Sequence, residues 1–240
     1  MTEPVVLDIS EIVDRFPAVR IALVVVRGLR LSETPTAAID EIVARCQIDA
    51  SAAIAGQELA SLPELAVWRD AYKAFGVKKT SYRSSVERLL KSLQRGNGLP
   101  RVNPLVDLYN AISARYRLPI GADDLALVTS PLAFRYARPT DTFIALGDRN
   151  ATPDPPKDGE IVYADAEKCL CRRWNWYQDA RSACSMTTRG AVLTVQSLGP
   201  VHGGTLEDAV QVLCGRISDA CRGAATVGMA DRNRPVAAVD

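Results

Sequence analysis

Two polar residues inside an apolar helical segment are the first candidates for chemistry in this 240-residue chain. Asp107 and Asn110 stand three residues apart in NPLVDLYNAI, which begins at Asn103 and is followed by a Leu-Pro. Asp and Asn are poor helix formers because their short side chains compete for nearby backbone groups. On the inner side of a helix each must be hydrogen-bonded, or it costs about 1–3 kcal/mol. The pair is therefore either a structural bracket or part of a pocket.

The segment RRWNWYQD, residues 172–179, is a second candidate. Alternation along a strand would place its first arginine and both tryptophans on one face. Two tryptophans that flank an amide can line a pocket and stack on a planar ligand. The alternative is that the tryptophans are core residues and the amide tethers a turn. The segment contributes Arg172, Trp174, Asn175, Trp176, Gln178 and Asp179.

Two further candidates are YRSS, residues 82–85, and the carboxylate of Asp165 near a strand end. Arg83 can hold a carboxylate or phosphate in a two-pronged contact. Ser84 can bind a ligand or, in the commoner role, cap a helix. The structural and the ligand-binding interpretations stay open for each of these residues.

Cysteine and histidine usage argues against a metal site. The six cysteines form no C-x-x-C pair, and His202 is the one histidine in the sequence. A zinc site normally needs four Cys or His ligands at close spacing. We therefore expect reduced thiols, no metal and no other cofactor, and a Ser-His-Asp or Cys-His centre is disfavoured.

Positive charge is concentrated in one segment, although the net charge is only +1. Between residues 69 and 101 nine Lys and Arg residues face two acidic ones. Such a segment is either a solvated helix face or a patch that binds phosphates, in which case binding falls with salt. The candidates for RNA contact are Lys78, Lys79, Arg88 and Lys91.

Hydrophobic periodicity predicts helices mostly in the first half and strands mostly in the second, which favours an α+β fold. Helices are expected from about residues 10, 34, 61, 82, 104 and 205, the third and last opened by S/T-x-x-E/D capping boxes. Expected strands are residues 5–9, 19–27, 125–128, 132–136, 142–146, 160–164, 170–174 and 191–196. We expect one domain over residues 1–222, and a loose tail over residues 223–240.

The chain shows no apolar run long enough to cross a membrane. Its first residues are acidic and lack the basic start of a signal peptide. The sequence therefore predicts a cytoplasmic protein that does not bind membranes.

Several of these motifs together resemble the editing and tRNA-binding domain of the phenylalanyl-tRNA synthetase β subunit. The similarity rests on NPLVDLYNAI, on residues 67–93 with their YRSS motif, and on residues 160–176 with RRWNW. It covers roughly residues 63–196 and is strongest to free-standing proteins that carry this domain without the synthetase. The resemblance implies a single-domain fold with a mixed, partly open barrel-like sheet and flanking helices.

In that family the domain hydrolyses the ester of wrongly charged tyrosyl-tRNA. Asp107 and Asn110 match the family's Asp and Asn, whereas Tyr109 replaces a Thr and Gly121 replaces the usual His. The family's pocket Glu has no visible counterpart. A base would have to come from Asp165, Asp179 or Asp107, or the reaction would have to rely on positioning and the substrate's own hydroxyl. The ligand therefore need not be tyrosine.

The sequence leaves two main functions open: a stand-alone hydrolase of mischarged aminoacyl-tRNA, and a non-catalytic module that binds RNA or an amino acid. A small-molecule enzyme or sensor is a weaker third. The expected partners are tRNA or aminoacyl-tRNA and a small amino-acid-like ligand, and not DNA. One pocket is expected to collect Arg83, Asp107, Asn110, Asn175 and Asp179. The candidate catalytic residues are Asn110, Asp107 and Asp179, and the candidate ligand-binding residues are Arg83, Ser84, Asn103, Asp165, Arg172, Trp174, Asn175 and Gln178.

Overall fold

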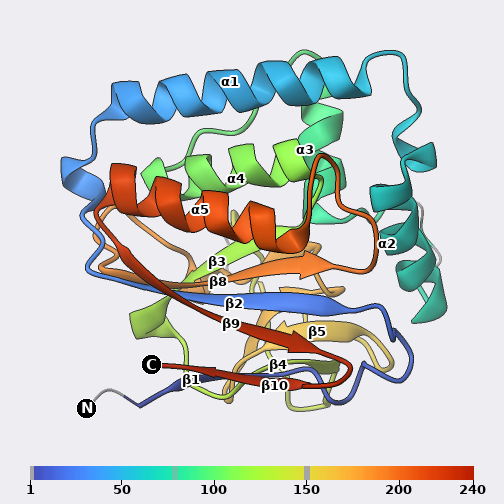
Figure 1. Ribbon diagram of the computed structural model, residues 1–240. Helices are drawn as coiled ribbons and strands as arrows, with labels where there is room; N and C mark the ends of the chain where they lie inside the picture. The colour runs from blue at the N-terminus through green and yellow to red at the C-terminus, as the bar shows by residue number, and fades with distance from the viewer. Residues whose placement is uncertain (1–2, 78, 80, 149–151) are drawn as a thin grey trace.

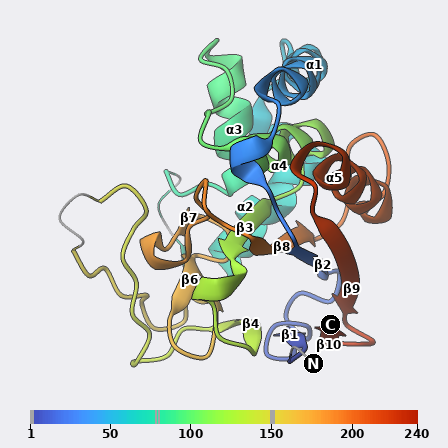
Figure 2. The same ribbon diagram turned by 90° about the vertical axis from the view of Figure 1, so that its left-hand side faces the viewer.

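A layer of helices covers one of two stacked β-sheets (Figure 1). The computed structural model describes residues 3–77, 79, 81–148 and 152–240. Helices α1 (Thr36–Ile54), α4 (Pro104–Tyr116) and α5 (Leu206–Cys221) lie together above a four-stranded sheet, and the second sheet lies on the far side of it (Figures 1 and 2). The α+β class expected from the sequence is confirmed.

The four-stranded sheet separates two hydrophobic cores. Its order is β3 (Ile120–Asp124), β8 (Gly190–Ser197), β2 (Arg20–Arg27), β9 (Ala224–Asp231), and all pairs are antiparallel. Strand β2 is apolar on both faces because alternate residues enter different cores. Ala22, Val24 and Val26 face the helices, whereas Ile21 and Leu23 face the other sheet. This two-sided burial explains the unbroken apolar run in its sequence.

The six-stranded sheet carries the other half of the inter-sheet core. Its order is β10 (Val236–Val239), β1 (Val5–Asp8), β4 (Leu132–Tyr136), β5 (Ile161–Ala164), β6 (Cys169–Arg172), β7 (Tyr177–Gln178). Strands β1 and β4 are parallel, and the other neighbours are antiparallel. Among the described residues neither sheet closes into a barrel, so the barrel-like sheet resolves into two separate open sheets.

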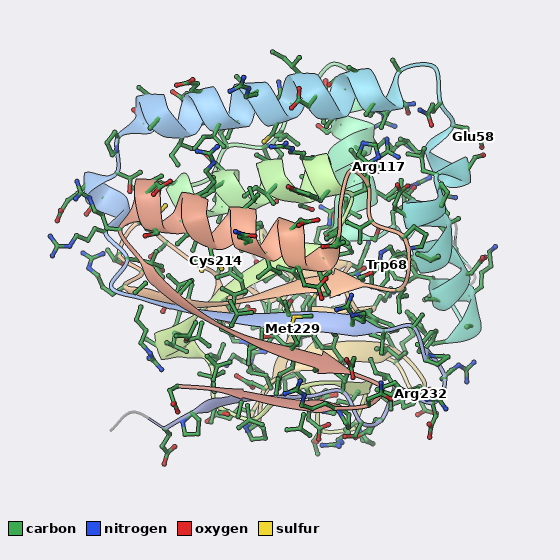
Figure 3. The ribbon with its side chains drawn as sticks, viewed as in Figure 1. Glu58, Trp68, Arg117, Cys214, Met229 and Arg232 are labelled. Atoms are coloured by element: carbon green, nitrogen blue, oxygen red, sulfur yellow. The ribbon has the colours of Figure 1, made fainter. Side chains whose placement is uncertain are left out.

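Five α-helices are present in the described part of the chain: α1 (Thr36–Ile54), α2 (Pro63–Ala74), α3 (Ser85–Gln94), α4 (Pro104–Tyr116) and α5 (Leu206–Cys221). Ser84 caps α3, Asn103 caps α4, and Thr205 with Asp208 forms the expected capping box of α5. Arg117 ends α4 in a left-handed conformation, and its guanidinium reaches Glu64 of α2 and the Ala53 carbonyl of α1. Figure 3 shows Arg117 at the end of α4 nearest α2. No helix in the described residues is long and apolar enough to cross a membrane.

The structure corrects four expectations about local elements. Residues 125–127 form a short 3-10 helix, and residues 142–146 make isolated bridges in place of a strand. The capping box expected at Ser61 is absent, because α2 begins at Pro63 and the residue before it, Leu62, has no polar side chain to cap it. Glu64 pairs with Arg117 instead. The segment after Ser10 forms turns and no helix.

The C-terminal segment was expected to be a loose tail, and this was wrong. It forms β9 along the whole of β2, then β10 beside β1. Its small residues are needed for close packing: a Cβ on Gly223 would lie 2.4 Å from Val26, and one on Gly228 would lie 2.8 Å from Val239. The glycine- and alanine-rich composition therefore reflects tight pairing.

Candidate functional site

A cavity of about 560 Å³ opens where α3 and α4 overhang the edges of the two sheets. We call it the Asp123 cavity after the carboxylate in its wall. Its apolar lining comes mainly from Leu89, Val106, Ile120 and Leu170. Its polar lining is Ser85, Arg88, Ser92, Asn97, Tyr109, Asn110, Asp123, Tyr163, Cys171, Asn175, Trp176, Tyr177, Gln178, Thr194 and Gln196.

The cavity forms because two sheet edges meet there. Strand β3 is an edge of the four-stranded sheet, and β7 is an edge of the six-stranded sheet (Figure 2). Gln178 of β7 joins them, since its Nε2 donates to the Ala122 carbonyl at 2.6 Å and to Asp123 Oδ1 at 2.9 Å. The Asp123 backbone also forms a bridge with Ala183. This part of the cavity wall is therefore formed by the ends of strands that are hydrogen-bonded to each other.

Asp123 is the one carboxylate among the described residues that line the cavity. Only 3% of the residue is exposed. Burial raises the pKa of Asp123 to about 7, against hydrogen bonds from Ser182 and Gln178 that lower it. Both of these bonds end on Oδ1, the Ser182 hydroxyl at 2.6 Å and the Gln178 amide at 2.9 Å. Among the described contacts, Oδ2 is left to receive a water or a ligand. A carboxyl that titrates near neutrality can accept and return a proton.

Two groups from the six-stranded sheet face the same cavity, Tyr163 of β5 and Cys171 of β6. The Tyr163 hydroxyl is buried without a hydrogen-bond partner. Burial and the nearby Asp123 charge raise the pKa of Tyr163 well above its usual value, so the hydroxyl stays protonated. The same two causes raise the pKa of the Cys171 thiol. Since the thiolate is the reactive form of cysteine, Cys171 is unsuited to be a nucleophile at neutral pH.

A buried chain of polar side chains forms the adjoining wall. Tyr72 donates to Asn175 Oδ1 at 2.8 Å, and Asn175 Nδ2 donates to Gln196 Oε1 at 3.1 Å. Gln196 in turn donates to the Thr194 hydroxyl at 3.1 Å. These bonds engage the Asn175 amide, so it holds the turn after β6 and shapes the wall.

Asn110 reaches the cavity from α4 and is half-buried. No described residue hydrogen-bonds to its side chain, which leaves the amide available to a ligand. Asn110 and Asn175 were expected to line one pocket although they lie far apart in sequence. The structure does place both of them, with Gln178, on the wall of the Asp123 cavity.

Arg88 of α3 stands at the cavity with its side chain exposed. Its Nη1 donates to the Trp176 carbonyl at 2.8 Å, and its guanidinium lies 4.0 Å from the centre of the Tyr177 ring. No carboxylate in the described part of the chain pairs with it within 4 Å. Arg88 therefore offers the remaining N–H groups of a fixed guanidinium to an anion.

Three residues expected in the shared pocket lie elsewhere. Asp107 accepts from Arg101 Nε and from the Val102 amide, both at 2.7 Å, so it is a structural bracket. Asp179 is fully buried, pairs with Arg181 and accepts from backbone amides. Arg83 pairs with Glu87 at 2.9 Å. The prediction that these three residues share one pocket was wrong, because each side chain is bound by a nearby partner outside the cavity.

Four candidate ligand residues also serve the fold. Ser84 and Asn103 are helix caps. Asp165 accepts from Lys168 Nζ at 2.7 Å and from three backbone amides. Although burial opposes it, these bonds lower the pKa of Asp165. Arg172 is fully buried against Glu160 at 2.8 Å.

Trp174 was expected to share a strand face with Trp176, and this was wrong. Strand β6 ends at Arg172, and the chain then turns with positive φ at Arg173 and Trp174. The turn sends Trp174 into the inter-sheet core, 5.4 Å from the Trp68 ring, whereas Trp176 lines the cavity. Figure 3 locates Trp68 on α2, beside the sheets.

The basic segment is partly neutralised by the fold. Arg69 and Arg83 pair with Glu87, and Arg101 pairs with Asp40 and Asp107. Lys79, Arg88 and Lys91 have no ion pair within the described residues, and Lys79 lies 6.0 Å from the Tyr82 ring centre. Lys78 lies outside the described residues.

Sequence reasoning missed Asp123 and Tyr163. The adjacent carboxylates in IGADD, directly after a Leu-Pro, could have indicated Asp123, because acidic residues at the end of a strand are candidates for a functional site. Tyr163 had no such signal, since IVYA reads as an ordinary core strand. The cavity thus combines a carboxyl that titrates near neutrality, a hydroxyl donor, a free amide and a rim cation, which suits hydrolysis of an acyl bond.

Comparison with known proteins gives a family match. The profile of the B3/4 domain matches residues 67–203, more than half of the chain. Matching solved structures include a crystal structure of an N-terminal fragment of the phenylalanyl-tRNA synthetase β-subunit from Pyrococcus horikoshii, with 13% identity and a TM-score of 0.48. The alignment covers 91% of this chain and 49% of that one, so the chain spans about half the length of that fragment. No curated protein gave a significant match.

Proposed function

The chain belongs to the B3/4 domain family, and we propose that it binds an aminoacyl ester carried by tRNA in the Asp123 cavity and hydrolyses it. The observation that carries this proposal is Asp123 itself. A carboxyl with a pKa of about 7 in the wall of an open cavity is largely ionised just above neutrality, yet basic enough to accept a proton. The family match supports a function associated with the tRNA synthetases.

The proposed reaction assigns a role to each of these cavity groups. Asp123 Oδ2 takes a proton from a water, and the oxygen of that water attacks the ester carbonyl carbon. The bond to the ribose oxygen then breaks, and Asp123 returns the proton to that leaving oxygen. Gln178 and Ser182 fix the carboxylate by holding Oδ1. A positioned base of this kind contributes about 10²–10⁴-fold in rate.

Substrate positioning falls to residues at the cavity wall and rim. The unengaged Asn110 amide can both donate to and accept from the aminoacyl group. Arg88 faces the phosphate side of the substrate, with Lys91 on the same helix. The apolar lining from α3, α4 and β6 receives the amino-acid side chain. These roles follow the chemistry of each group and do not name the amino acid.

The test is deacylation of a panel of mischarged tRNAs by the purified chain. Wild-type protein should release at least one amino acid faster than spontaneous hydrolysis, and Asp123→Asn should slow this by about 10²–10⁴-fold. Asp70→Asn is the matched control, because Asp70 is exposed and pairs only with Lys73 among described residues. A panel left untouched at micromolar protein would refute the proposed activity.

A non-catalytic binding module is the second candidate, and one observation favours it. The Asn175 amide is already engaged by Tyr72 and Gln196, as expected for a rigid receptor. A module of this kind would bind tRNA or an amino acid saturably without turnover. Binding that survives Asp123→Asn, with no deacylation by either protein, would select this candidate.

A further inference from the structure

The Tyr163 hydroxyl is a buried polar group that the fold itself does not use. The residue is 4% exposed, and its oxygen has no hydrogen-bond partner. Buried hydroxyls are nearly always paired, so an unpaired one calls for an explanation. Two other buried side-chain atoms in the described structure are unpaired, on Arg173 and Trp174, and neither residue lines the Asp123 cavity.

The position of Tyr163 is tightly fixed. It pairs with Phe134 across β4 and β5, and the two rings stack with centres 4.7 Å apart and an interplanar angle of 18°. On its other side it pairs with Cys171, where the register shifts between Tyr163 and Ala164. Bulges of this kind re-aim side chains and are common beside active sites. The hydroxyl is therefore held in place before any ligand binds.

The Tyr163 hydroxyl has a proton to donate to an incoming acceptor. Burial and the charge of Asp123 raise its pKa and keep its proton on at neutral pH. Tyr163 and Asp123 line the same cavity, on the walls contributed by the two sheets. One wall thus offers a proton acceptor, and the other offers a fixed O–H.

We propose that the Tyr163 hydroxyl donates a hydrogen bond to the carbonyl oxygen of the bound ester while Asp123 handles the attacking water. This inference rests on the proposed hydrolysis. As the water oxygen bonds to the carbonyl carbon, its proton passes to Asp123 and negative charge builds on the carbonyl oxygen. Tyr163 stabilises that charge and keeps its own proton. When the ester bond breaks, the carbonyl reforms and Asp123 returns its proton to the ribose oxygen.

The test compares Tyr163→Phe with Tyr116→Phe, which removes a hydroxyl from a buried tyrosine outside the cavity. Loss of one oxyanion donor typically lowers kcat by about 10²–10³-fold. We expect that loss for Tyr163→Phe with little change in KM, and none for Tyr116→Phe. The pH at which the rate of Tyr163→Phe bends should be the same as in wild type, because Asp123 determines it. Equal kcat values for Tyr163→Phe and wild type would overturn the inference while the hydrolysis stands.

A folding measurement separates this inference from the activity. Because the hydroxyl has no partner in the fold, Tyr163→Phe should unfold at the same or a higher urea concentration than wild type. A clearly lower midpoint would mean that the hydroxyl stabilises the fold, and the inference would fall even if deacylation is found. An inactive wild type would refute the proposed function and this role together.

Discussion

Replacing Asp123 by Asn should stabilise the folded protein at alkaline pH, and this advantage should shrink as the solution is acidified. In the unfolded chain the carboxyl ionises near pH 4, its ordinary value. In the folded protein burial holds it protonated up to about pH 7. The folded state therefore binds more protons than the unfolded state between these values. The resulting stability is fully present below about pH 4 and is lost as pH rises through 7.

The magnitude follows from the size of the shift. A shift from 3.8 to about 7 spans roughly 3 pKa units, and each unit corresponds to 1.36 kcal/mol. The ceiling is about 4 kcal/mol, and more than half of it falls between pH 5 and pH 8. Asn preserves the acceptor oxygen for Ser182 and Gln178, so the variant removes the charge and keeps the contacts.

The assay is urea unfolding of wild type and Asp123→Asn at several pH values across this range. The free energy of unfolding of wild type should fall relative to the variant by about 2–3 kcal/mol from pH 5 to pH 8. Asp70→Asn serves as the control, since its carboxylate is exposed and should give a curve parallel to wild type. If the curves of Asp123→Asn and wild type are parallel, folding does not shift the pKa of this carboxyl, and the reasoning about the cavity fails.

Three further outcomes are expected. Glu160→Ala leaves the fully buried Arg172 without its main partner and should cost about 3–5 kcal/mol in urea unfolding, so a decrease below about 1 kcal/mol would contradict the burial argument. Thr205→Ala removes the capping box of α5 and should cost about 1 kcal/mol, with Thr205→Ser largely restoring it. Reversing Arg88 and Lys91 to Glu should weaken tRNA binding and lower its salt slope by roughly one for each phosphate that the variant no longer neutralises; an unchanged slope would place the RNA elsewhere.

Local signals in the sequence were reliable where one residue decides the structure. The capping box at Thr205 was correctly predicted, because it satisfies amides within the same turn. For Ser84 the structure shows the cap, one of the two roles that the sequence left open. The unbroken apolar run of β2 was also recognised, since both of its faces are buried.

The structural features that the sequence did not predict depend on long-range packing. The non-periodic, Ala-, Arg- and Pro-rich composition of residues 223–240 suggested a loose tail. Gly223 and Gly228 lie instead where neighbouring chain segments approach too closely for a side chain. Glu64 fitted a capping box, but α2 begins at Pro63 and Glu64 pairs with the buried Arg117. Competing partners of this kind are invisible to spacing rules.

The same limit applies to the site. Asn110 and Asn175 were expected to converge because buried amides need partners, and both reach the Asp123 cavity. Asp107 and Asp179 were satisfied nearby, by Arg101 and Arg181, and so do not join them. Asp123 became the central candidate through burial created by two meeting sheet edges.

The most direct measurement is single-turnover deacylation of a mischarged tRNA by wild type and Asp123→Asn across the pH range around neutrality, corrected for spontaneous hydrolysis. For wild type we expect the rate to rise with pH, to bend near pH 7 as Asp123 ionises, and then to level off. Asp123→Asn should be slower by about 10²–10⁴-fold and should lack that bend. Equal rates, or the same pH profile in both proteins, would contradict the assignment of Asp123 as the base in this cavity.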